Sequence, residues 1–542
     1  MKPFMAVTAL ICVALGTSAQ TAAPSLSNIQ APQKCTLSGT VVDAVSGDPL
    51  NKVNLSLEPA DRGSALIETS VTVSDEKGHF EMVDLGAGVY RLKGARSGYL
   101  ETAYGSHRLG AEGARVRLEA GQNLADVTLK LTPGGAIAGM VRDSDGEPLE
   151  SAYVTLARFT YEQGVRAVRR EAATTTDDRG EYRFHGLAAG KYYIGVEAGA
   201  LDFPFRVDRS GKPASAEMSI PTIYPNVNDL ALATPVEVAP GRRVSGVDVT
   251  MIRSRVFRVA GRVLNLPGRV VSVELEDARN SGIRDHPLRA STRNASGDFE
   301  FRGVPPGIYY VNTVADSNHI GTRIDVGDAD IEGVRLTLQP GATIEKLQIA
   351  AEGDEKPDAS GISMQLSEPN GRGYSVISMF GRGGVTAGRY PVVRFSGGLL
   401  RRFYVKSARA GDADILADGL TVPAGGRVQV AVMLASDGAK LEGVVRNAKE
   451  ELAPGATVAL VPNTRDRIYF FQTTTSDQNA HFEFTAIPPG GYAVFAWDDV
   501  EPGSWYDPDF LRIYEKRAQQ TALGSRENKT IDLHLAIPPD GQ

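Results

Sequence analysis

The sequence has few cysteines, few aromatic residues and no excess of basic residues. Cys12 and Cys35 are the only cysteines in 542 residues. A network of disulfides or a multi-cysteine metal site cannot be built from them, so stability must come from hydrophobic cores. The net charge is −7, whereas binding to the phosphate backbone of nucleic acids requires concentrated Lys and Arg. We therefore expect no nucleic acid among the partners.

Long hydrophobic runs are also missing, apart from one of about a dozen residues at 4–15. This run is too short to cross a bilayer, for which about 20 residues are needed. It follows a positively charged start and precedes the small residues 17–19, which predicts a cleavable signal peptide over 1–19. Anchoring through Cys12 is disfavoured, because the residue before it is a bulky isoleucine. We expect a mature chain without a transmembrane segment that is secreted, periplasmic or on the outer cell surface.

What the chain does have is glycine and proline, with 58 and 30 copies, and a normal share of hydrophobic residues at 42%. This composition favours many short strands joined by tight turns over long helices. Single hydrophobic cores stop growing at roughly 250–300 residues, so several domains are expected.

A repeated motif supports this interpretation. It consists of a turn, two apolar residues two positions apart, a hydrophobic residue, a glycine and a tyrosine. Twelve residues separate the small residue of the turn from the tyrosine in each copy, and these pairs are Gly78 and Tyr90, Gly180 and Tyr192, Gly297 and Tyr309, and Ala480 and Tyr492.

Each position of the motif has a physical reason. Apolar residues two apart, such as Phe80 and Met82, predict a strand with one buried face. Segments such as Val304-Pro-Pro-Gly cannot continue a β-ladder, so the chain must turn there. The tyrosine that follows is expected to bury its ring and to bond its hydroxyl to nearby backbone, as tyrosine corners do. A worn copy of this corner occurs at Thr386–Tyr390.

Unit boundaries can be read around these motifs. A strand that contains a glycine precedes each of the four clear copies, at Gly39, Gly139, Gly261 and Gly443, and another strand closes each unit. The sequence thus predicts a signal peptide at 1–19, a linker at 20–35 and β-sandwiches at 36–132, 133–253, 254–339, 340–436 (degenerate) and 437–538.

Together, the Gly-x-Val-x-Asp strand, the Gly-x-Pro-Leu turn and the Asp-x-x-Gly-x-Phe-x-Phe block resemble the carboxypeptidase regulatory-like domain. The same residues are similar to collagen-adhesin B-type repeats and to starch-binding-like folds. The resemblance implies a transthyretin-like (prealbumin-type) fold, that is, an all-β tandem array of about five seven-stranded antiparallel sandwiches. Such modules occur in adhesins, in outer-membrane transporters and as appendages of peptidases, so the resemblance does not fix an activity.

The residues give no support to an enzyme. A zinc carboxypeptidase needs a His-x-x-Glu pair and a distant histidine, and none of the seven histidines has a glutamate three residues later. The chain also lacks a Gly-x-Ser-x-Gly elbow, a Walker-type loop and a His-Glu-x-x-His helix. Asp143-Ser-Asp-Gly resembles part of a calcium loop, but the remaining ligands do not follow. We expect no catalytic residue, no metal site and no cofactor.

One segment in the last unit is unusual, because it contains both tryptophans. Asp507-Pro508 predicts the start of a short helix, and one interpretation is that the two tryptophans close this helix onto the core. The other is a shallow ligand-binding platform of aromatic rings and carboxylates, which suits sugar rings or a peptide. Its residues would be Trp497, Asp498, Asp499, Glu501, Trp505 and Tyr506.

Two functions follow. The first is an exported, non-enzymatic modular protein with a structural or adhesive role at the cell envelope, whose partners are extracellular or envelope proteins or glycans. The second is a carbohydrate-binding protein that uses the aromatic and acidic segment of the last unit.

Overall fold

The computed structural model describes most of the chain beyond the predicted signal peptide. The described ranges are 33–60, 69–106, 108, 110–162, 164–198, 217–266, 270–280, 282–284, 287–292, 296–314, 321–340, 342–352, 357, 362–367, 374–378, 383–465 and 468–537. The predicted signal peptide and nearly all of the predicted linker lie outside them. Cys35, which we assigned to the linker, is instead the first residue of the first strand and is fully buried.

Within these ranges the protein is an all-β array, as predicted. The strands gather into five bodies, which we call units 1 to 5 and which each surround a hydrophobic cluster of their own. We propose that each unit is one domain with the boundaries given above, except that unit 1 begins at Cys35 and unit 2 extends to Arg255.

Unit 1 consists of two sheets. Its strands are β1 (Cys35–Asp43), β2 (Asn54–Pro59), β3 (Ser70–Val73), β4 (His79–Leu85), β5 (Gly88–Ala95), β6 (Thr102–Ala103), β7 (Val116–Leu118) and β8 (Asn123–Leu131). One sheet has the order β4-β1-β8 and the other β3-β2-β5-β6, with β7 also paired to β5.

Unit 2 repeats this plan with a longer hairpin. Its elements are β9 (Gly135–Arg142), β10 (Tyr153–Glu162), β11 (Val165–Thr175), β12 (Glu181–Leu187), β13 (Gly190–Glu197), β14 (Glu217–Ile220), β15 (Thr222–Ile223), η2 (Leu230–Leu232), β16 (Val236–Val238), β17 (Arg243–Val244), β18 (Val249–Thr250) and β19 (Ile252–Arg255). The sheets are β12-β9-β17, with β18 also on β9, and β11-β10-β13-β15, with β16 on β13, while β14 pairs with β19.

Unit 3 has three strands in one sheet and four in the other, ordered β23-β20-β26 and β22-β21-β24-β25. The strands are β20 (Phe257–Leu264), β21 (Ser272–Asp277), β22 (Leu288–Ser291), β23 (Asp298–Val304), β24 (Gly307–Val314), β25 (Thr322–Val326) and β26 (Ile331–Thr337).

Unit 4, predicted as degenerate, distributes its strands differently. Its sheets are β30-β27-β36-β33-β34, β29-β28-β32 and β31-β35. The elements are β27 (Ala342–Ala351), β28 (Ser363–Ser367), β29 (Tyr374–Ser378), β30 (Gly383–Val385), β31 (Gly388–Tyr390), β32 (Val393–Ser396), η4 (Gly398–Arg401), β33 (Tyr404–Ala410), β34 (Ala413–Asp414), α1 (Ile415–Asp418), β35 (Leu420–Val422) and β36 (Arg427–Ala435).

Unit 5 returns to the common plan, with sheets β40-β37-β43, where β44 also pairs with β37, and β39-β38-β41-β42. Its elements are β37 (Ala439–Arg446), β38 (Thr457–Pro462), η5 (Ile468–Phe470), β39 (Gln472–Thr475), β40 (His481–Ile487), β41 (Gly490–Trp497), η6 (Ser504–Tyr506), α2 (Pro508–Tyr514), η7 (Glu515–Arg517), β42 (Gln519–Leu523), β43 (Asn528–Thr530) and β44 (Leu533–His534).

The first strand of each unit lies between two partners. In units 1, 2, 3 and 5 it pairs antiparallel with the strand that carries the repeated apolar pair, and in unit 4 with β30. Its other neighbour is parallel in all five units. The expectation of antiparallel sheets therefore holds for most strand pairs, but the pairing of the first strand with this second neighbour is parallel. The glycine of the first strand stands where the parallel partner comes closest: a Cβ on Gly443 would lie 1.6 Å from the carbonyl oxygen of Ile531.

The predicted tyrosine corners are confirmed in all five units, including the worn copy. Each tyrosine ring is at most 3% exposed, and its hydroxyl donates a hydrogen bond of 2.7–2.9 Å to the carbonyl oxygen four residues earlier. The pairs are Tyr90 and Gly86, Tyr192 and Ala188, Tyr309 and Pro305, Tyr390 and Thr386, and Tyr492 and Pro488. The bond fixes the corner between two sheets.

The corner of unit 3 gives a testable stability effect. We expect Tyr309→Phe to lower the free energy of unfolding by about 1–2 kcal/mol, because the buried Pro305 carbonyl loses its donor. Burial raises the pKa of Tyr309 to about 12, so the folded state favours the neutral phenol. Stability should therefore fall as pH rises above about 10, where the unfolded tyrosine ionises. Urea unfolding between about pH 8 and pH 11.5 should show a shallower decline in the variant.

Tyr310→Phe is the matched control, because Tyr310 lies on the opposite face of β24 and is only half-buried. An equal loss of stability in both variants would show that the corner bond has no special weight.

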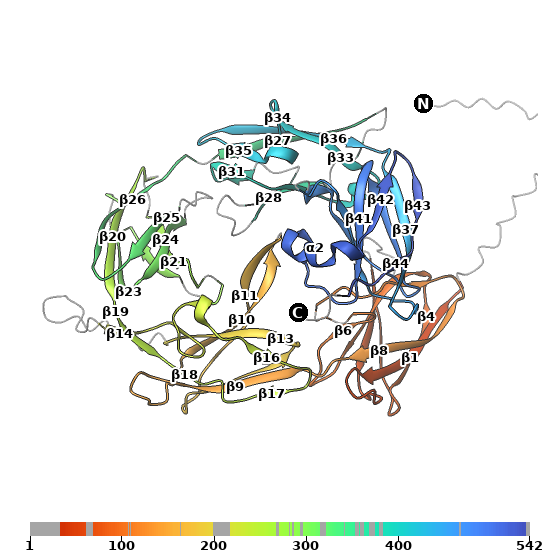
Figure 1. Cartoon of the computed structure of the whole chain (residues 1–542), viewed down its shortest axis with the longest axis horizontal. Coiled ribbons are helices and arrows are strands. Elements are labelled where there is room, and N and C mark those ends of the chain that lie inside the picture. Colours follow the sequence, from red (N-terminus) through yellow and green to blue (C-terminus); the bar gives the residue numbers. More distant parts are fainter. Residues whose placement is uncertain are drawn as a thin grey trace, which may run out of the picture.

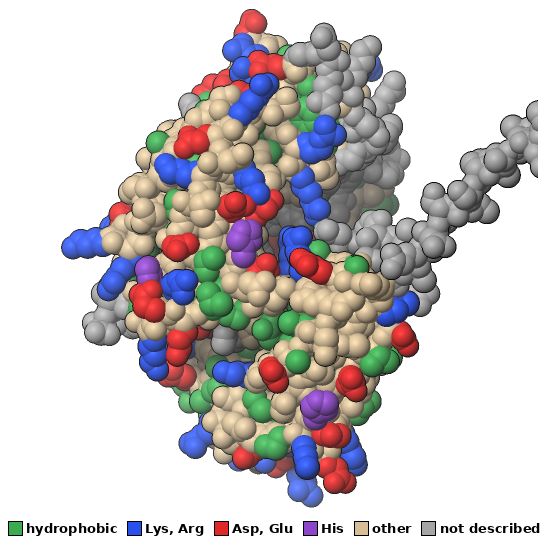
Figure 2. Space-filling view, turned by 90° about the vertical axis from the view of Figure 1, so that its right-hand side faces the viewer, with side chains coloured by type: hydrophobic (Ala, Val, Ile, Leu, Met, Phe, Trp, Pro, Cys, Tyr) green, Lys and Arg blue, Asp and Glu red, His purple; other side chains and the backbone are tan. Residues whose placement is uncertain are grey.

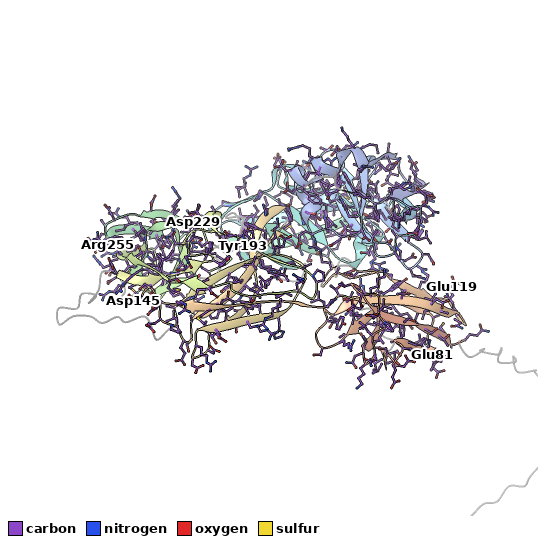
Figure 3. All side chains as sticks on the ribbon, turned by 60° about the horizontal axis from the view of Figure 1, so that its bottom comes forward. Glu81, Glu119, Asp145, Tyr193, Asp229 and Arg255 are labelled. Atoms are coloured by element: carbon purple, nitrogen blue, oxygen red, sulfur yellow. The ribbon has the colours of Figure 1, made fainter. Side chains whose placement is uncertain are left out.

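The five units follow one another around a closed ring (Figure 1). Unit 5, in blue, lies beside unit 1, in red to orange, and the β10–β11 hairpin of unit 2 extends toward α2. Segments separated by nearly 400 residues are therefore neighbours. Glu81 and Glu119 lie on the outer surface of unit 1, away from these contacts (Figure 3).

Candidate functional site

The segment that we singled out begins at the end of β41 and runs into α2. Asp507 caps α2 as predicted: its carboxylate accepts a 2.8 Å hydrogen bond from the backbone N–H of Asp509, and Pro508 is the first helical residue. Leu511 is 2% exposed, and α2 covers the outer face of the sheet that contains β41. The local fold thus follows from a cap, a proline and an apolar face.

Trp497 does not offer a face to a ligand. Its side chain is only 2% exposed and stacks on Phe495, with ring centroids 5.3 Å apart and planes 4° apart. Phe510 and Tyr514 of α2 contact the same indole, at 6.0 and 5.8 Å between centroids. Trp497 therefore holds the helix on the sheet, which agrees with the first of the two interpretations.

Two of the carboxylates form ion pairs with other units. Arg108 of unit 1 contacts Asp499 at 2.7 Å between Nε and Oδ1, and its other guanidinium nitrogen contacts Glu501. Arg158, on β10 of unit 2, approaches the second oxygen of Glu501 at 3.9 Å. Arg108, Arg158 and Glu501 are each less than a quarter exposed. We call this group the acidic latch: Arg108, Arg158, Asp499 and Glu501.

Tyr506 is also engaged between units. The guanidinium of Arg394 in unit 4 lies 4.2 Å from the centroid of its ring, which is a cation–π geometry. Gly164 at the tip of the β10–β11 hairpin packs on its backbone, where an added Cβ would lie 2.7 Å from Tyr506 Cβ. Of the six predicted site residues, Asp499, Glu501 and Tyr506 are therefore brought together with other units, Trp497 is buried, and Asp498 and Trp505 line a hollow described below.

A second set of contacts between units 1 and 5 adjoins the latch. The side-chain amide of Gln478 accepts from the N–H of Arg117 and donates to its carbonyl, both at 3.1 Å. The backbone N–H of Gln478 donates to the carbonyl of Arg115. Gly455 approaches Gly105 so closely that a Cβ on Gly455 would lie 1.7 Å from the Gly105 oxygen. Gln478 thereby provides hydrogen-bond partners for the backbone N–H and carbonyl of Arg117 at the outer edge of β7.

Sequence reasoning missed Arg108, Arg158 and Gln478. Each comes from another unit or another turn, and no local pattern distinguishes it from an ordinary surface residue. Gly105, Gly164 and Gly455 were the available signal, because an isolated glycine outside the repeated positions can mark a close approach of backbone.

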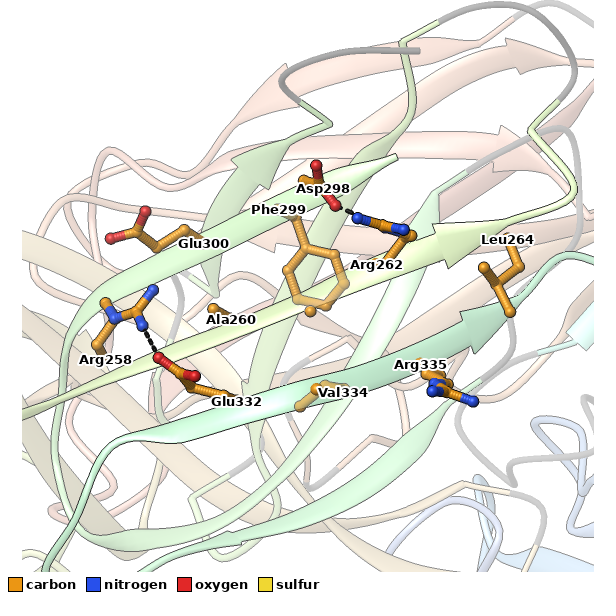
Figure 4. Close-up of a pocket in the computed structure, with 12 residues that line it drawn as sticks. Arg258, Ala260, Arg262, Leu264, Asp298, Phe299, Glu300, Glu332, Val334 and Arg335 are labelled. Atoms are coloured by element: carbon orange, nitrogen blue, oxygen red, sulfur yellow. Dashed lines mark hydrogen bonds and ion pairs between the residues drawn. The ribbon is translucent and has the colours of Figure 1, made fainter. Parts of the chain in front are cut away.

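The other large hollows follow from the repeat itself. One of about 580 Å³ lies over β20, β23 and β26 of unit 3 (Figure 4). Arg262 pairs with Asp298 at 2.6 Å and Arg258 with Glu332 along its sides. A similar hollow surrounds Gly139 in unit 2. Both lie over the first strand of their unit and its two neighbours, at the same place in the repeated fold, so we assign them to the fold.

In the part of the chain that the structure describes, no group of three or more His, Cys, Asp or Glu side chains is placed to hold a metal ion. No helix of these ranges is long and apolar enough to cross a membrane. His107, His286 and His319 lie outside the described residues.

The fold and the tyrosine corners define a modular prealbumin-like β-sandwich protein. Residues 36–132 and 136–202 match the family model described as "Carboxypeptidase regulatory-like domain", which confirms the resemblance for these two stretches. The search of curated proteins found no match.

Several solved structures are similar to parts of the chain. The Bacillus anthracis TIE protein is 14% identical over 56% of this chain and 50% of its own, with a TM-score of 0.17. The minor pilin GBS52 of Streptococcus agalactiae is 13% identical over 40% and 95%, with a TM-score of 0.22. The shaft pilin SpaA of Lactobacillus rhamnosus GG is 12% identical over 41% and 98%, with a TM-score of 0.19. The chain thus spans half the length of the TIE protein. Likeness at these scores carries no conclusion about function.

Proposed function

We propose that this protein is an exported, non-enzymatic structural component of the cell envelope, a closed scaffold that presents its outer faces to envelope proteins or glycans. The observation that carries the proposal is the contact of unit 5 with both unit 1 and unit 2 through the acidic latch. A chain of sandwiches that closes on itself holds its outer surfaces in fixed positions, whereas a flexible string does not.

The joint between units 2 and 3 supports a rigid body. Arg284 bonds Asp277 at 3.0 Å between Nη1 and Oδ2 and approaches Glu197 of unit 2 at 3.7 Å. Asn280 donates to Asp277 and to the carbonyl of Asn228, both at 2.9 Å. Partly buried charges that are paired and hydrogen-bonded in this way tolerate little displacement.

The joint between units 4 and 5 is also packed. Tyr404 donates to Asp437 at 2.9 Å, and Thr485 of β40 donates to the carbonyl of Arg401 at 3.0 Å. Tyr469 of unit 5 packs against the core of unit 4. Relative motion of domains is the default when interfaces are small and polar, and these two joints oppose it.

Mixed charge suits an outward-facing role. The face that carries units 1 and 5 shows Lys and Arg interspersed with Asp and Glu, with hydrophobic side chains scattered among them (Figure 2). The alternative function, carbohydrate binding on a platform of Trp497 and its neighbours, does not fit the burial of Trp497 or the pairing of Asp499 and Glu501. We therefore do not propose carbohydrate binding on a platform that includes Trp497.

Deletion of the gene tests the scaffold role. We expect deleted cells to lose resistance to detergent and to osmotic shock, and the intact chain to restore both. A chain without residues 1–19 is the control, because it should stay inside the cell and restore neither. Full resistance in deleted cells, or rescue by the chain without the signal, would contradict the proposal.

A further inference from the structure

A cleft of about 430 Å³ lies between units 1 and 5, next to the acidic latch. Its floor belongs to the edge of the sheet that contains β39. Thr475 is paired across strands with Thr457, which is itself paired with Trp497. Side chains of such cross-strand neighbours share a face, so these threonines lie beside the tryptophan on the outer face of the sheet, and Thr473 follows two residues away.

The two walls come from different units. Unit 5 contributes the turn from Asp498 to Pro502 and the side chain of Trp505, whereas unit 1 contributes residues 110–113 and Arg115. The indole Nε1 of Trp505 is hidden from solvent and has no hydrogen-bond partner among the described residues. Because this nitrogen is hidden even from a water-sized molecule, Trp505 offers the cleft its ring rather than its N–H.

The chemistry of the lining is polar and nearly balanced in charge. Hydroxyl groups of threonine both donate and accept hydrogen bonds, and they form the floor. Arginines at 108 and 115 face carboxylates at 112, 498 and 499 around the rim. Among the described residues no ion pair engages the guanidinium of Arg115, which leaves a planar donor at the rim.

We propose that this cleft binds a neutral saccharide. Its volume is within the range of about 300–1,000 Å³ that is typical of small-ligand sites. Hydroxyl groups, a guanidinium and a carboxylate rim match the many donors and acceptors of a sugar, and the aromatic ring of Trp505 suits its apolar C–H surface. An anionic ligand would meet the rim carboxylates, and a cationic ligand would meet the two arginines.

This site differs from the platform predicted from the sequence. It keeps Asp498 and Trp505, leaves Trp497 buried, and takes its second wall from unit 1. Saccharide binding goes beyond the scaffold role and does not depend on it. The gene deletion tests the scaffold role and the saccharide array tests this site, so either proposal can fail while the other holds.

The test is a printed array of neutral oligosaccharides and polysaccharides, probed with the labelled full-length mature chain. We expect saturable binding to at least one neutral saccharide, and about tenfold weaker binding by the double variant Thr473→Val and Thr475→Val, which removes hydroxyls from the floor. Valine is isosteric and favoured in strands, so the variant should fold. Circular dichroism and thermal unfolding verify this.

Thr72→Val is the matched control, because Thr72 lies on β3, the corresponding edge strand of unit 1. Its saccharide binding should equal that of the unchanged chain. Arg115→Ala should weaken binding without opening the ring, since Arg115 is not part of the latch. The proposal is wrong if no neutral saccharide binds, or if the double variant binds saccharide as tightly as the control. A random peptide display library identifies the other ligand class. If peptides bind, the cleft variants abolish their capture and saccharides show no binding, the cleft is a peptide site and the proposal is wrong.

Discussion

Gly443→Ala should destabilise unit 5 by at least about 3 kcal/mol and lower its melting temperature by more than roughly 12 °C. The added Cβ would lie 1.6 Å from the carbonyl oxygen of Ile531, 2.7 Å from its carbonyl carbon and 3.1 Å from the Phe482 ring. The first two are backbone atoms of the parallel partner, so no side-chain rotation can relieve the overlap. The strands must separate, and the hydrogen bonds between β37 and β43 are lost. Thermal unfolding followed by circular dichroism and calorimetry measures the effect.

The matched control is Gly327→Ala. Gly327 has a backbone conformation open to other residues, and its Cβ would meet no atom within 4 Å. The exchange should change the melting temperature by no more than a degree or two, since it also reduces the entropy of the unfolded chain slightly. Equal effects of the two substitutions would mean that the parallel strand does not approach Gly443 as described.

The repeated glycine and tyrosine show what could be predicted from the sequence. The spacing of Gly78 and Tyr90 predicted a turn, a half-buried strand and a corner, because each of these is set by residues close together in the chain. The corner was predicted even where the motif is worn, and Tyr390 makes the same hydrogen bond as the others. Local geometry is fixed by local chemistry, so the sequence was informative at this level.

The reason for the glycine in the first strand could not be predicted. Gly39 recurs at one position of the motif, but its partner is the carbonyl of Val127, 88 residues away and on a parallel strand. Nothing in the alternation of apolar residues distinguishes a parallel neighbour from an antiparallel one. The first strand of unit 4 contains no glycine, and its bulge falls between Ile344 and Lys346. The strands of this unit are also distributed among its sheets differently from those of the other units.

The candidate site was predicted only in part. The cap at Asp507 and the helix that follows were predicted, because capping depends on adjacent residues. The partners of Asp499 and Glu501 were not, since Arg108 lies more than 390 positions earlier in the chain. Acidic residues next to aromatic rings predict a polar surface but not whether solvent, a ligand or another unit covers it.

Arg108→Glu should open the ring. The substitution replaces the cation between Asp499 and Glu501 with a third carboxylate, in a place where Arg108 is 24% and Glu501 is 21% exposed. Loss of a partly buried pair costs about 2 kcal/mol or more, so the ratio of closed to open molecules should fall roughly 30-fold. Small-angle X-ray scattering should show a larger radius of gyration and a longer maximum dimension, while the melting temperatures of the separate units stay unchanged.

Arg427→Glu is the control, because Arg427 also pairs with a glutamate, Glu345, at 3.1 Å but is 78% exposed and lies within unit 4. Its scattering curve should equal that of the unchanged chain. High salt should enlarge the unchanged protein only slightly, because screening acts weakly on a pair whose members, Arg108 and Glu501, are less than a quarter exposed. Gly455 and Gln478 hold units 1 and 5 together without charge, so the salt effect should be smaller than that of charge reversal. A variant that scatters like the control at low salt would show that these uncharged contacts close the ring by themselves.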